Sequence, residues 1–431
     1  MFFRSMSPDD AFSKIKRAVT ESALSKNEVA ALLHAAAADM VQEAEALGLR
    51  GDIWYLFLAL RLATDENPLG FVAELSEASA RPRGSIVEMA KHELGAIHRV
   101  ITSARGMVEN GGSHEALRPL SNYEPSSVRK PSIRPDALTA ANELAYAAAD
   151  MSFGGDPSVG SRLCEALIDF YMSMGSGPFS LNCAFRWSSG QKCLVPVAEP
   201  DPMTLDDLVG YDTQKQELRA NTELFMSRRP ANNVLLFGDS GTGKSSSVRA
   251  LLNEPGYVRR GLRMIELYKG QFQDIPIILD TIRRRNYRFV IFMDDLSFEE
   301  FEVDYKYLKA LIEGGIESRP ENVLIYATSN RRNLIREVWA DRKKSSDDVH
   351  GADTMQEKLS LADRFGVTIW YGSGNKQAYM DIARALAHEQ GIEMDAAELE
   401  KLALRWEIAH GGFTGRTARQ FVQHLLAETK S

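Results

Sequence analysis

The chain has 431 residues, 44% hydrophobic and 26% charged, and this length predicts two or three domains rather than one core. Its formal net charge of −8 argues against general binding to nucleic acid or anionic lipid, and no apolar run approaches the roughly 18 residues that span a membrane. The three cysteines have no metal-ligand spacing and suit a reducing compartment, so the cytoplasm is the expected location.

The first part of the chain carries a helical pattern. Residues 27–49 are rich in alanine with apolar residues at helical spacing, and residues 52–64 (DIWYLFLALRLAT) are almost entirely apolar. The second stretch is too short to span a bilayer, so we expect it at the centre of a helical N-terminal domain over residues 1–179. Prolines between residues 119 and 135 predict a loop, followed by helices at 136–151 and 157–173.

Residues 180–203 predict a β-hairpin and a linker. The sequence CAFRWSSGQKCLVPV (183–197) favours two short strands about a turn at 188–191. Pairing around that turn sets Cys183 opposite Pro196 rather than Cys193, so no disulfide is expected.

From residue 204 onward, helix and strand signals alternate. Five short apolar runs predict strands at 233–237, 262–267, 289–293, 323–327 and 367–371. Strands separated by helices usually form a parallel sheet covered on both faces. We therefore expect a three-layer α/β/α core with a mainly parallel five-stranded sheet over residues 204–372, and a C-terminal helical lid over 373–431.

A phosphate-binding motif follows the first of these strands. The sequence NVLLFGDSGTGKSSS (233–247) matches the P-loop, or Walker A, pattern G-x-x-x-x-G-K-[ST]. Successive N–H groups of such a loop form a cradle for phosphate oxygens. Lys244 supplies charge to the β- and γ-phosphates and Ser245 a hydroxyl ligand to Mg²⁺, so ATP and Mg²⁺ are the expected ligands of a P-loop NTPase. The predicted cradle consists of Gly238, Asp239, Ser240, Gly241, Thr242, Gly243, Lys244, Ser245 and Ser246.

Two later strands end in residues that suit the same site. RFVIFMDDL (288–296) ends in Asp294, predicted to hold Mg²⁺, and Asp295, predicted to polarise the attacking water as the Walker B pair. The next strand is followed by Asn330, whose amide can reach the γ-phosphate and orient the water without competing as a base.

With these motifs in place, the chain from residue 204 resembles an AAA+ ATPase module, and more narrowly the AAA+ family called domain of unknown function 815. The resemblance implies that Val209 and Gly210 lie near the base, with Tyr211 as a further candidate, and that Asn330 is sensor 1. It rests on DPMTLDDLVGYDTQK (201–215), NVLLFGDSGTGKSSSVRALL (233–252), FMDDLSFE (292–299), YATSNRRNLI (326–335), LADRFG (361–366) and GRTARQF (415–421).

The resemblance also assigns roles to arginines. Arg364 occupies the place of an arginine finger, which reaches the γ-phosphate of a neighbouring subunit and so implies a homo-oligomer. A guanidinium stays charged and forks onto phosphate oxygens. Arg416 or Arg419 is the expected sensor 2, and the sequence does not choose between them.

The expected function is an ATPase that binds Mg-ATP and hydrolyses it to drive conformational change on an unidentified protein partner. Many AAA+ modules have glutamate where this chain has Asp295, and a misplacement of about 1 Å can cost on the order of 10²-fold in rate. Glu299 and Glu300 are nearby substitutes. The alternative is a nucleotide-dependent binding switch or loader with little hydrolysis. A small-molecule kinase is disfavoured by Asn330, Arg364 and the helical tail.

Overall fold

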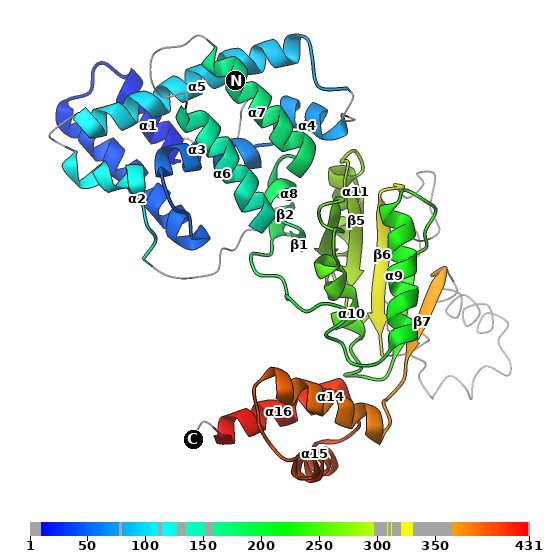
Figure 1. Cartoon of the computed structure of the whole chain (residues 1–431). Coiled ribbons are helices and arrows are strands. Elements are labelled where there is room, and N and C mark those ends of the chain that lie inside the picture. Colours follow the sequence, from blue (N-terminus) through cyan, green and yellow to red (C-terminus); the bar gives the residue numbers. More distant parts are fainter. Residues whose placement is uncertain are drawn as a thin grey trace. The chain divides into compact units, whose positions relative to one another are not determined.

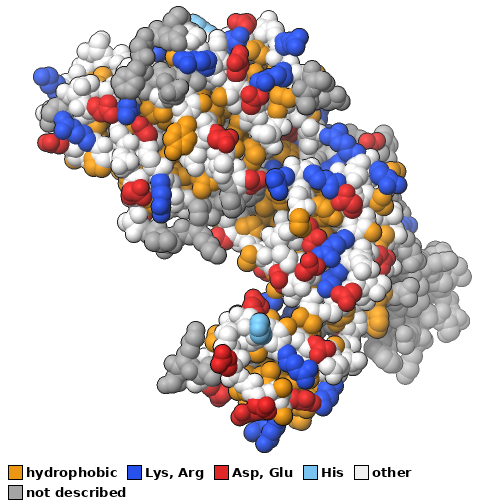
Figure 2. Space-filling view, viewed as in Figure 1, with side chains coloured by type: hydrophobic (Ala, Val, Ile, Leu, Met, Phe, Trp, Pro, Cys, Tyr) orange, Lys and Arg blue, Asp and Glu red, His pale blue; other side chains and the backbone are white. Residues whose placement is uncertain are grey.

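The chain divides into two compact units, residues 1–182 and 183–431. The structure is a computed structural model that describes residues 10–76, 80–110, 114–126, 135–150, 158–296, 308, 312, 320–330 and 364–429 (Figure 1). Within these ranges, no helix combines the length and the apolar character needed to cross a membrane. On the face shown in Figure 2, basic and acidic side chains are intermingled.

The described residues of the N-terminal unit are mainly helical. One expectation was wrong: the loop does not begin at residue 119, because a 3₁₀ helix continues through Pro119 and buries Leu117 and Leu120. The helices are α1 (Ala11–Thr20), α2 (Lys26–Leu47), α3 (Ile53–Thr64), α4 (Pro68–Leu75), α5 (Ser85–Asn110), the 3₁₀ helix η1 (Glu115–Asn122), α6 (Pro135–Asp150), α7 (Val159–Met174) and α8 (Pro178–Leu181).

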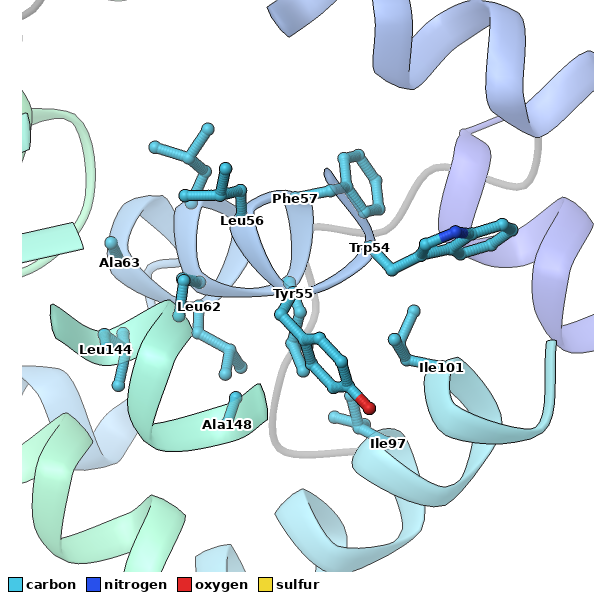
Figure 3. Packing of buried hydrophobic residues seen from close by; sticks show 14 of the residues in the cluster. Trp54, Tyr55, Leu56, Phe57, Leu62, Ala63, Ile97, Ile101, Leu144 and Ala148 are labelled. Atoms are coloured by element: carbon cyan, nitrogen blue, oxygen red, sulfur yellow. The ribbon is translucent and has the colours of Figure 1, made fainter. Parts of the chain in front are cut away.

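Helix α3 lies at the centre of this unit. Its side chains are buried on all sides except at Arg61 and Thr64. Figure 3 shows Tyr55 pointing toward α5, which contributes Ile97 and Ile101, while other side chains of α3 point toward α6. A helix that is apolar all round and about 12 residues long is a buried core helix rather than a membrane span.

The C-terminal unit contains a seven-stranded sheet in the order β2-β1-β4-β5-β6-β3-β7. Among these strands, only β1 and β2 pair antiparallel, and the other neighbours pair in parallel. The strands are β1 (Ala184–Ser188), β2 (Cys193–Pro196), β3 (Val234–Gly238), β4 (Leu262–Glu266), β5 (Arg288–Met293), β6 (Val323–Ser329) and β7 (Val367–Tyr371).

The five predicted strands are present, but the predicted strand count was too low. The hairpin belongs to the same sheet, because β1 pairs in parallel with β4 through Ala184 opposite Met264 and Arg186 opposite Glu266. Its register also differs from the prediction by two residues, since Phe185 rather than Cys183 lies opposite Pro196. Cys164, Cys183 and Cys193 are free thiols.

Alternate residues of the strands face a core shared with the helices that precede and follow β3 in sequence. Leu236 of β3, Phe292 of β5 and Tyr326 of β6 share one cluster with Leu218 and Val248. Side chains of a strand alternate between the two faces of the sheet, so every second residue packs on the same side. Among the described residues, the helices of the sheet region are α9 (Asp212–Met226), α10 (Lys244–Ala250), η2 (Leu251–Asn253), η3 (Phe272–Asp274) and α11 (Ile275–Ile282).

The last three helices form a separate small core around Tyr379 and Phe421. They are α14 (Lys376–Glu389), α15 (Ala396–His410) and α16 (Gly415–Thr429). The backbone N–H of Arg416 at the start of α16 donates to the carbonyl of Gly241, at 3.2 Å. This hydrogen bond joins the C-terminal helices to the loop after β3.

Candidate functional site

A cavity of about 800 Å³ lies where the carboxyl ends of β3, β5 and β6 meet. Its volume is typical of a site for a small organic ligand. Parallel α/β sheets bind ligands at this edge, because the loops after the strands converge there. The lining comes from residues 206–209, Tyr211 and Lys215, from residues 240–247, Arg249, Asp294, Asp295, Thr328 and Asn330, and from Ile382, Ala385, Leu386, Glu389, Gly415, Arg416 and Arg419.

The loop after β3 has a backbone that depends on glycine. Gly238, Gly241 and Gly243 have φ values of 133°, 77° and 94°, a region that other residues rarely adopt. A Cβ atom at Gly238 would lie 2.0 Å from the carbonyl oxygen of Tyr371. The loop therefore passes directly against the end of β7, and a side chain at Gly238 would displace one of the two.

Lys244 folds its ammonium group back onto the loop. Its Nζ donates to the carbonyls of Gly238 and Asp239, at 3.0 and 2.6 Å, and to Oδ1 of Asn330, at 3.1 Å. Burial lowers the pKa of Lys244, partly offset by the carboxylates of Asp239, Asp295 and Asp294. Phosphate oxygens are stronger acceptors than carbonyls, so this ammonium group can exchange its partners for a bound phosphate.

Ser245 and Asp294 bring two oxygens together. The Oγ of Ser245 donates to Oδ1 of Asp294 at 2.5 Å, and the same oxygen accepts from Thr328 Oγ1, at 2.6 Å, and from the backbone N–H of Asp295, at 3.1 Å. One carboxylate with one hydroxyl suits Mg²⁺, which keeps waters and substrate phosphates as its other ligands. The described residues contain no group of three or more His, Cys, Asp or Glu that could form an all-protein metal cage.

Asp295 and Asn330 also meet at this edge. The Nδ2 of Asn330 donates to Oδ1 of Asp295 at 2.8 Å, and the N–H of Asp295 donates to Thr328 Oγ1 at 3.0 Å. Asp295 has φ of 51°, a left-handed conformation that aspartate tolerates better than most residues. Both predicted residues therefore line the cavity, while the substitutes Glu299 and Glu300 lie outside the described residues.

The side of the cavity nearer the N-terminus of α9 contains aromatic and apolar side chains. Tyr211 lies with its ring 4.9 Å from that of Tyr371 and donates its hydroxyl to the carbonyl of Gly372, at 2.8 Å. Val209 lines the cavity, whereas Gly210, with φ of 80°, is not among its lining residues. Leu208 and, from α14, Leu386 add apolar surface.

Two predicted loop residues lie next to the cavity rather than on its wall. Gly238 and Asp239 are absent from its lining residues. The carboxylate of Asp239 accepts from the N–H and the hydroxyl of Ser373, both at 2.7 Å, and these hydrogen bonds lower the pKa of Asp239. Asp239 thus connects the loop to the segment that follows β7.

The two candidate sensor 2 arginines both line the cavity. Nη1 of Arg416 lies 3.4 Å from Oγ of Ser240, within the loop after β3. Nη2 of Arg419 instead lies 4.0 Å from the sulfur of Met203.

Arg364 lies away from this cavity. It precedes β7, where Val367 pairs with Val234 at the amino end of β3 and Tyr371 pairs with Gly238 at the carboxyl end. Arg364 is therefore at the amino edge of the sheet, and it is not among the residues that line the cavity at the carboxyl edge.

Thr328 and Arg249 line the cavity, contact Asp294 and were missed by the sequence reasoning. Thr328 links Asp294 and Asp295 through its hydroxyl group. Arg249 donates from Nη2 to Oδ2 of Asp294 at 2.9 Å and to Oε1 of Glu266 at 3.3 Å. A signal for Arg249 exists in the sequence: it lies four residues after Ser245, so both fall on one face of a helix.

Comparison with known proteins gives a family match over more than half of the chain. The family model described as "Protein of unknown function (DUF815)" matches residues 180–429. The chain is 25% identical over 282 residues to a probable spastin homolog of Brugia malayi, covering 55% of this chain and 62% of that protein. It is 26% identical over 166 residues to proteasome-activating nucleotidase 1 of Haloferax volcanii, covering 33% of this chain and 41% of that protein.

A further curated relative is the 26S proteasome regulatory subunit 6B homolog of Aspergillus niger, 31% identical over 111 residues, which are 23% of this chain and 26% of that protein. The chain thus spans less than two thirds of the length of each of these relatives. Among solved structures, the RuvB Holliday junction branch migration motor of Thermotoga maritima matches with a TM-score of 0.37 and 18% identity, over 53% of this chain and 66% of that chain.

Proposed function

We propose that this chain, which belongs to the DUF815 family within the AAA+ superfamily of ATPases, binds Mg-ATP in the cavity at the carboxyl edge of its sheet and hydrolyses it. One observation carries this proposal. Lys244, Ser245, Asp294, Asp295 and Asn330, which come from three segments of the chain, form one connected hydrogen-bond network beside a nucleotide-sized cavity.

In this proposal, Lys244 exchanges the carbonyls of Gly238 and Asp239 for oxygens of the β- and γ-phosphates. Ser245 and Asp294 hold Mg²⁺, which when bound neutralises charge on the phosphates. Asp295 accepts a proton from the attacking water, and Asn330, already hydrogen-bonded to Asp295, orients that water.

The C-terminal helices are proposed to respond to the nucleotide. Arg416 is the better candidate for sensor 2, because its backbone donates to Gly241 and its guanidinium lies beside Ser240, whereas Arg419 lies beside Met203. A phosphate in the loop would attract the Arg416 guanidinium and shift α16 relative to the sheet. This movement is the proposed output to a protein partner.

Arg364 is proposed to act on the nucleotide of a neighbouring copy. Its position before β7, at the amino edge of the sheet, supports this role because the chain's own phosphate loop begins at the opposite edge. The active assembly is then a homo-oligomer in which each cavity is completed by the Arg364 of an adjacent subunit.

One observation favours a second candidate function, a nucleotide-dependent switch with little hydrolysis. The Asp295 side chain is short, and one of its oxygens already accepts a hydrogen bond from Asn330. Single-turnover hydrolysis measured beside an ATP-binding titration separates the two functions. Tight binding with negligible turnover would favour the switch.

The nucleotide site is tested by Lys244→Ala. We expect this change to abolish binding of a fluorescent ATP analogue and release of phosphate, because the only ammonium group predicted to contact the β- and γ-phosphates is removed. The matched control is Lys376→Ala, an exposed lysine of α14 paired with Glu400. Wild-type binding and turnover in Lys244→Ala would refute the site.

A further inference from the structure

Arg249 is paired with the carboxylate that is proposed to hold Mg²⁺. Oδ1 of Asp294 accepts hydrogen bonds from Ser245, Thr328 and the N–H of Asp295. Oδ2 of the same carboxylate accepts from Arg249 Nη2 at 2.9 Å. Because Oδ1 is already held by three donors, the orientation of Asp294 does not depend on Arg249, and what Arg249 adds is a positive charge.

A second carboxylate lies within reach of the same guanidinium nitrogen. Glu266, at the end of β4, accepts from Arg249 Nη2 through Oε1 at 3.3 Å. Its other oxygen, Oε2, accepts from Arg186 at 3.1 Å and from the Tyr268 hydroxyl at 2.9 Å, which fixes the carboxylate in place. Glu266 is thus an immobilised acceptor that presents one oxygen to Arg249.

The guanidinium group of Arg249 can bind either carboxylate without a large movement. It lies 5.5 Å from the centroid of the Phe292 ring, between Asp294 and Glu266, and its side chain is 40% exposed. The aromatic face keeps the cation near both carboxylates. A small rotation of the side chain can strengthen the bond to Glu266 while it gives up the bond to Asp294.

We propose that Arg249 is a resident counter-ion of Asp294 that transfers to Glu266 when Asp294 is used for Mg²⁺. This inference rests on the proposed function and concerns the regulation of the same site. Arg249 is a positioning residue in this scheme: it raises the Mg²⁺ concentration needed to complete the nucleotide site, and Glu266 lowers that concentration by accepting the displaced cation.

The test is a MgCl₂ titration of the binding of N-methylanthraniloyl-ATP, followed by fluorescence, with EDTA as the metal-free reference. Arg249→Gln is expected to lower the half-saturating Mg²⁺ concentration by about two- to fivefold, the range that a partly exposed ion pair supports. Glu266→Gln is expected to raise it by a similar factor, because Arg249 is then left with Asp294 alone.

The double variant distinguishes transfer of Arg249 from a general change of charge. If Glu266 acts through Arg249, then adding Glu266→Gln to Arg249→Gln should shift the half-saturating concentration by less than about 1.5-fold. Arg249→Lys keeps the charge and should stay close to the wild type. The matched control is Arg260→Gln, since Arg260 also pairs with a carboxylate, Glu223, and lies over a tyrosine ring, but does not line the cavity.

The inference would be overturned if the two single changes shifted the half-saturating Mg²⁺ concentration independently in the double variant. It would also be overturned if the folded single variants kept the wild-type Mg²⁺ dependence of binding, or if both showed the same weakening of it. Thermal unfolding of each nucleotide-free variant shows whether it is folded, and Glu266→Gln, which should raise the half-saturating Mg²⁺ concentration by itself, keeps the test decisive if Arg249→Gln does not fold. Absence of any analogue binding by the wild type would instead refute the proposed function, and this inference with it.

Discussion

Replacing Thr328 by valine tests whether its hydroxyl group organises the two aspartates. Thr328 is 1% exposed, and its Oγ1 donates to Asp294 Oδ1 at 2.6 Å while accepting from the N–H of Asp295 at 3.0 Å. Valine has nearly the same shape, so Thr328→Val removes these two hydrogen bonds and leaves the packing of β6 intact.

The expected cost follows from the partners of that hydroxyl. A hydrogen bond to a charged group contributes about 1.5–3 kcal/mol to stability. Asp294 Oδ1 keeps its bonds to Ser245 and to the N–H of Asp295, so the lower end, about 1.5 kcal/mol, is expected for the free energy of unfolding. Loss of the bond to the Asp295 backbone should loosen that carboxylate, and single-turnover hydrolysis should fall by about tenfold or more.

The measurements are urea unfolding, binding of a fluorescent ATP analogue and single-turnover hydrolysis. Thr222→Val is the matched control, because Thr222 is also fully buried and its hydroxyl bonds to Leu218 and Tyr326 away from the cavity. This control should lose similar stability, about 1–2 kcal/mol, without a change in hydrolysis. Equal hydrolysis by Thr328→Val, Thr222→Val and the wild type would refute the reasoning.

Three other expectations concern separate parts of the chain. Gly160→Ala should destabilise the N-terminal unit by about 1–3 kcal/mol, measured by urea unfolding, because its Cβ would lie 2.1 Å from the Lys91 carbonyl; unchanged stability would contradict this packing. Arg364→Ala should keep nucleotide binding but lose any rise in ATPase rate per protomer with protein concentration, and the same rise in wild type and variant would exclude its action on a neighbour. Hydrogen bonds from Lys192 and Trp187 lower the pKa of Asp274 from 3.8 to about 2. The stability due to this depressed pKa is fully present above the ordinary value and is lost as pH falls through the folded value. The free energy of unfolding of the wild type should therefore exceed that of Asp274→Asn at pH 7, and the difference should shrink between about pH 4 and pH 2. A gap independent of pH would contradict that assignment.

The sheet could be predicted from sequence where strands are buried on both faces. The residues of β6 are all buried, and such a short, continuously buried run has few other interpretations. Because parallel strands end at one edge, the prediction of the strands also brought Asp294 and Asn330 near the loop after β3. In the structure, Asn330 contacts Lys244 and Asp294 contacts Ser245.

The residues that escaped prediction depend on contacts between distant segments. The sequence indicated the hairpin but not its pairing with β4, because nothing in the sequence of a short strand such as β1 indicates which strand it will pair with. Thr328 belongs to an ordinary strand ending, and it becomes important only because Asp294 and Asp295 directly follow the neighbouring strand β5. Arg249 lies within the segment 233–252 that carries the family resemblance, but the pattern gives it no role, and its two carboxylate partners lie at the ends of separate strands.

The position of the hairpin also bears on aggregation. An open sheet edge is a template on which another chain can add a strand. Beyond β4, the sheet continues with β1 and then with β2 at its edge. Strand β2 has four residues and ends in Pro196, a residue with no N–H to donate. A short strand that ends in proline resists such addition. Copies of this chain that approach the β2 edge would therefore have to associate through side chains rather than by continuing the sheet.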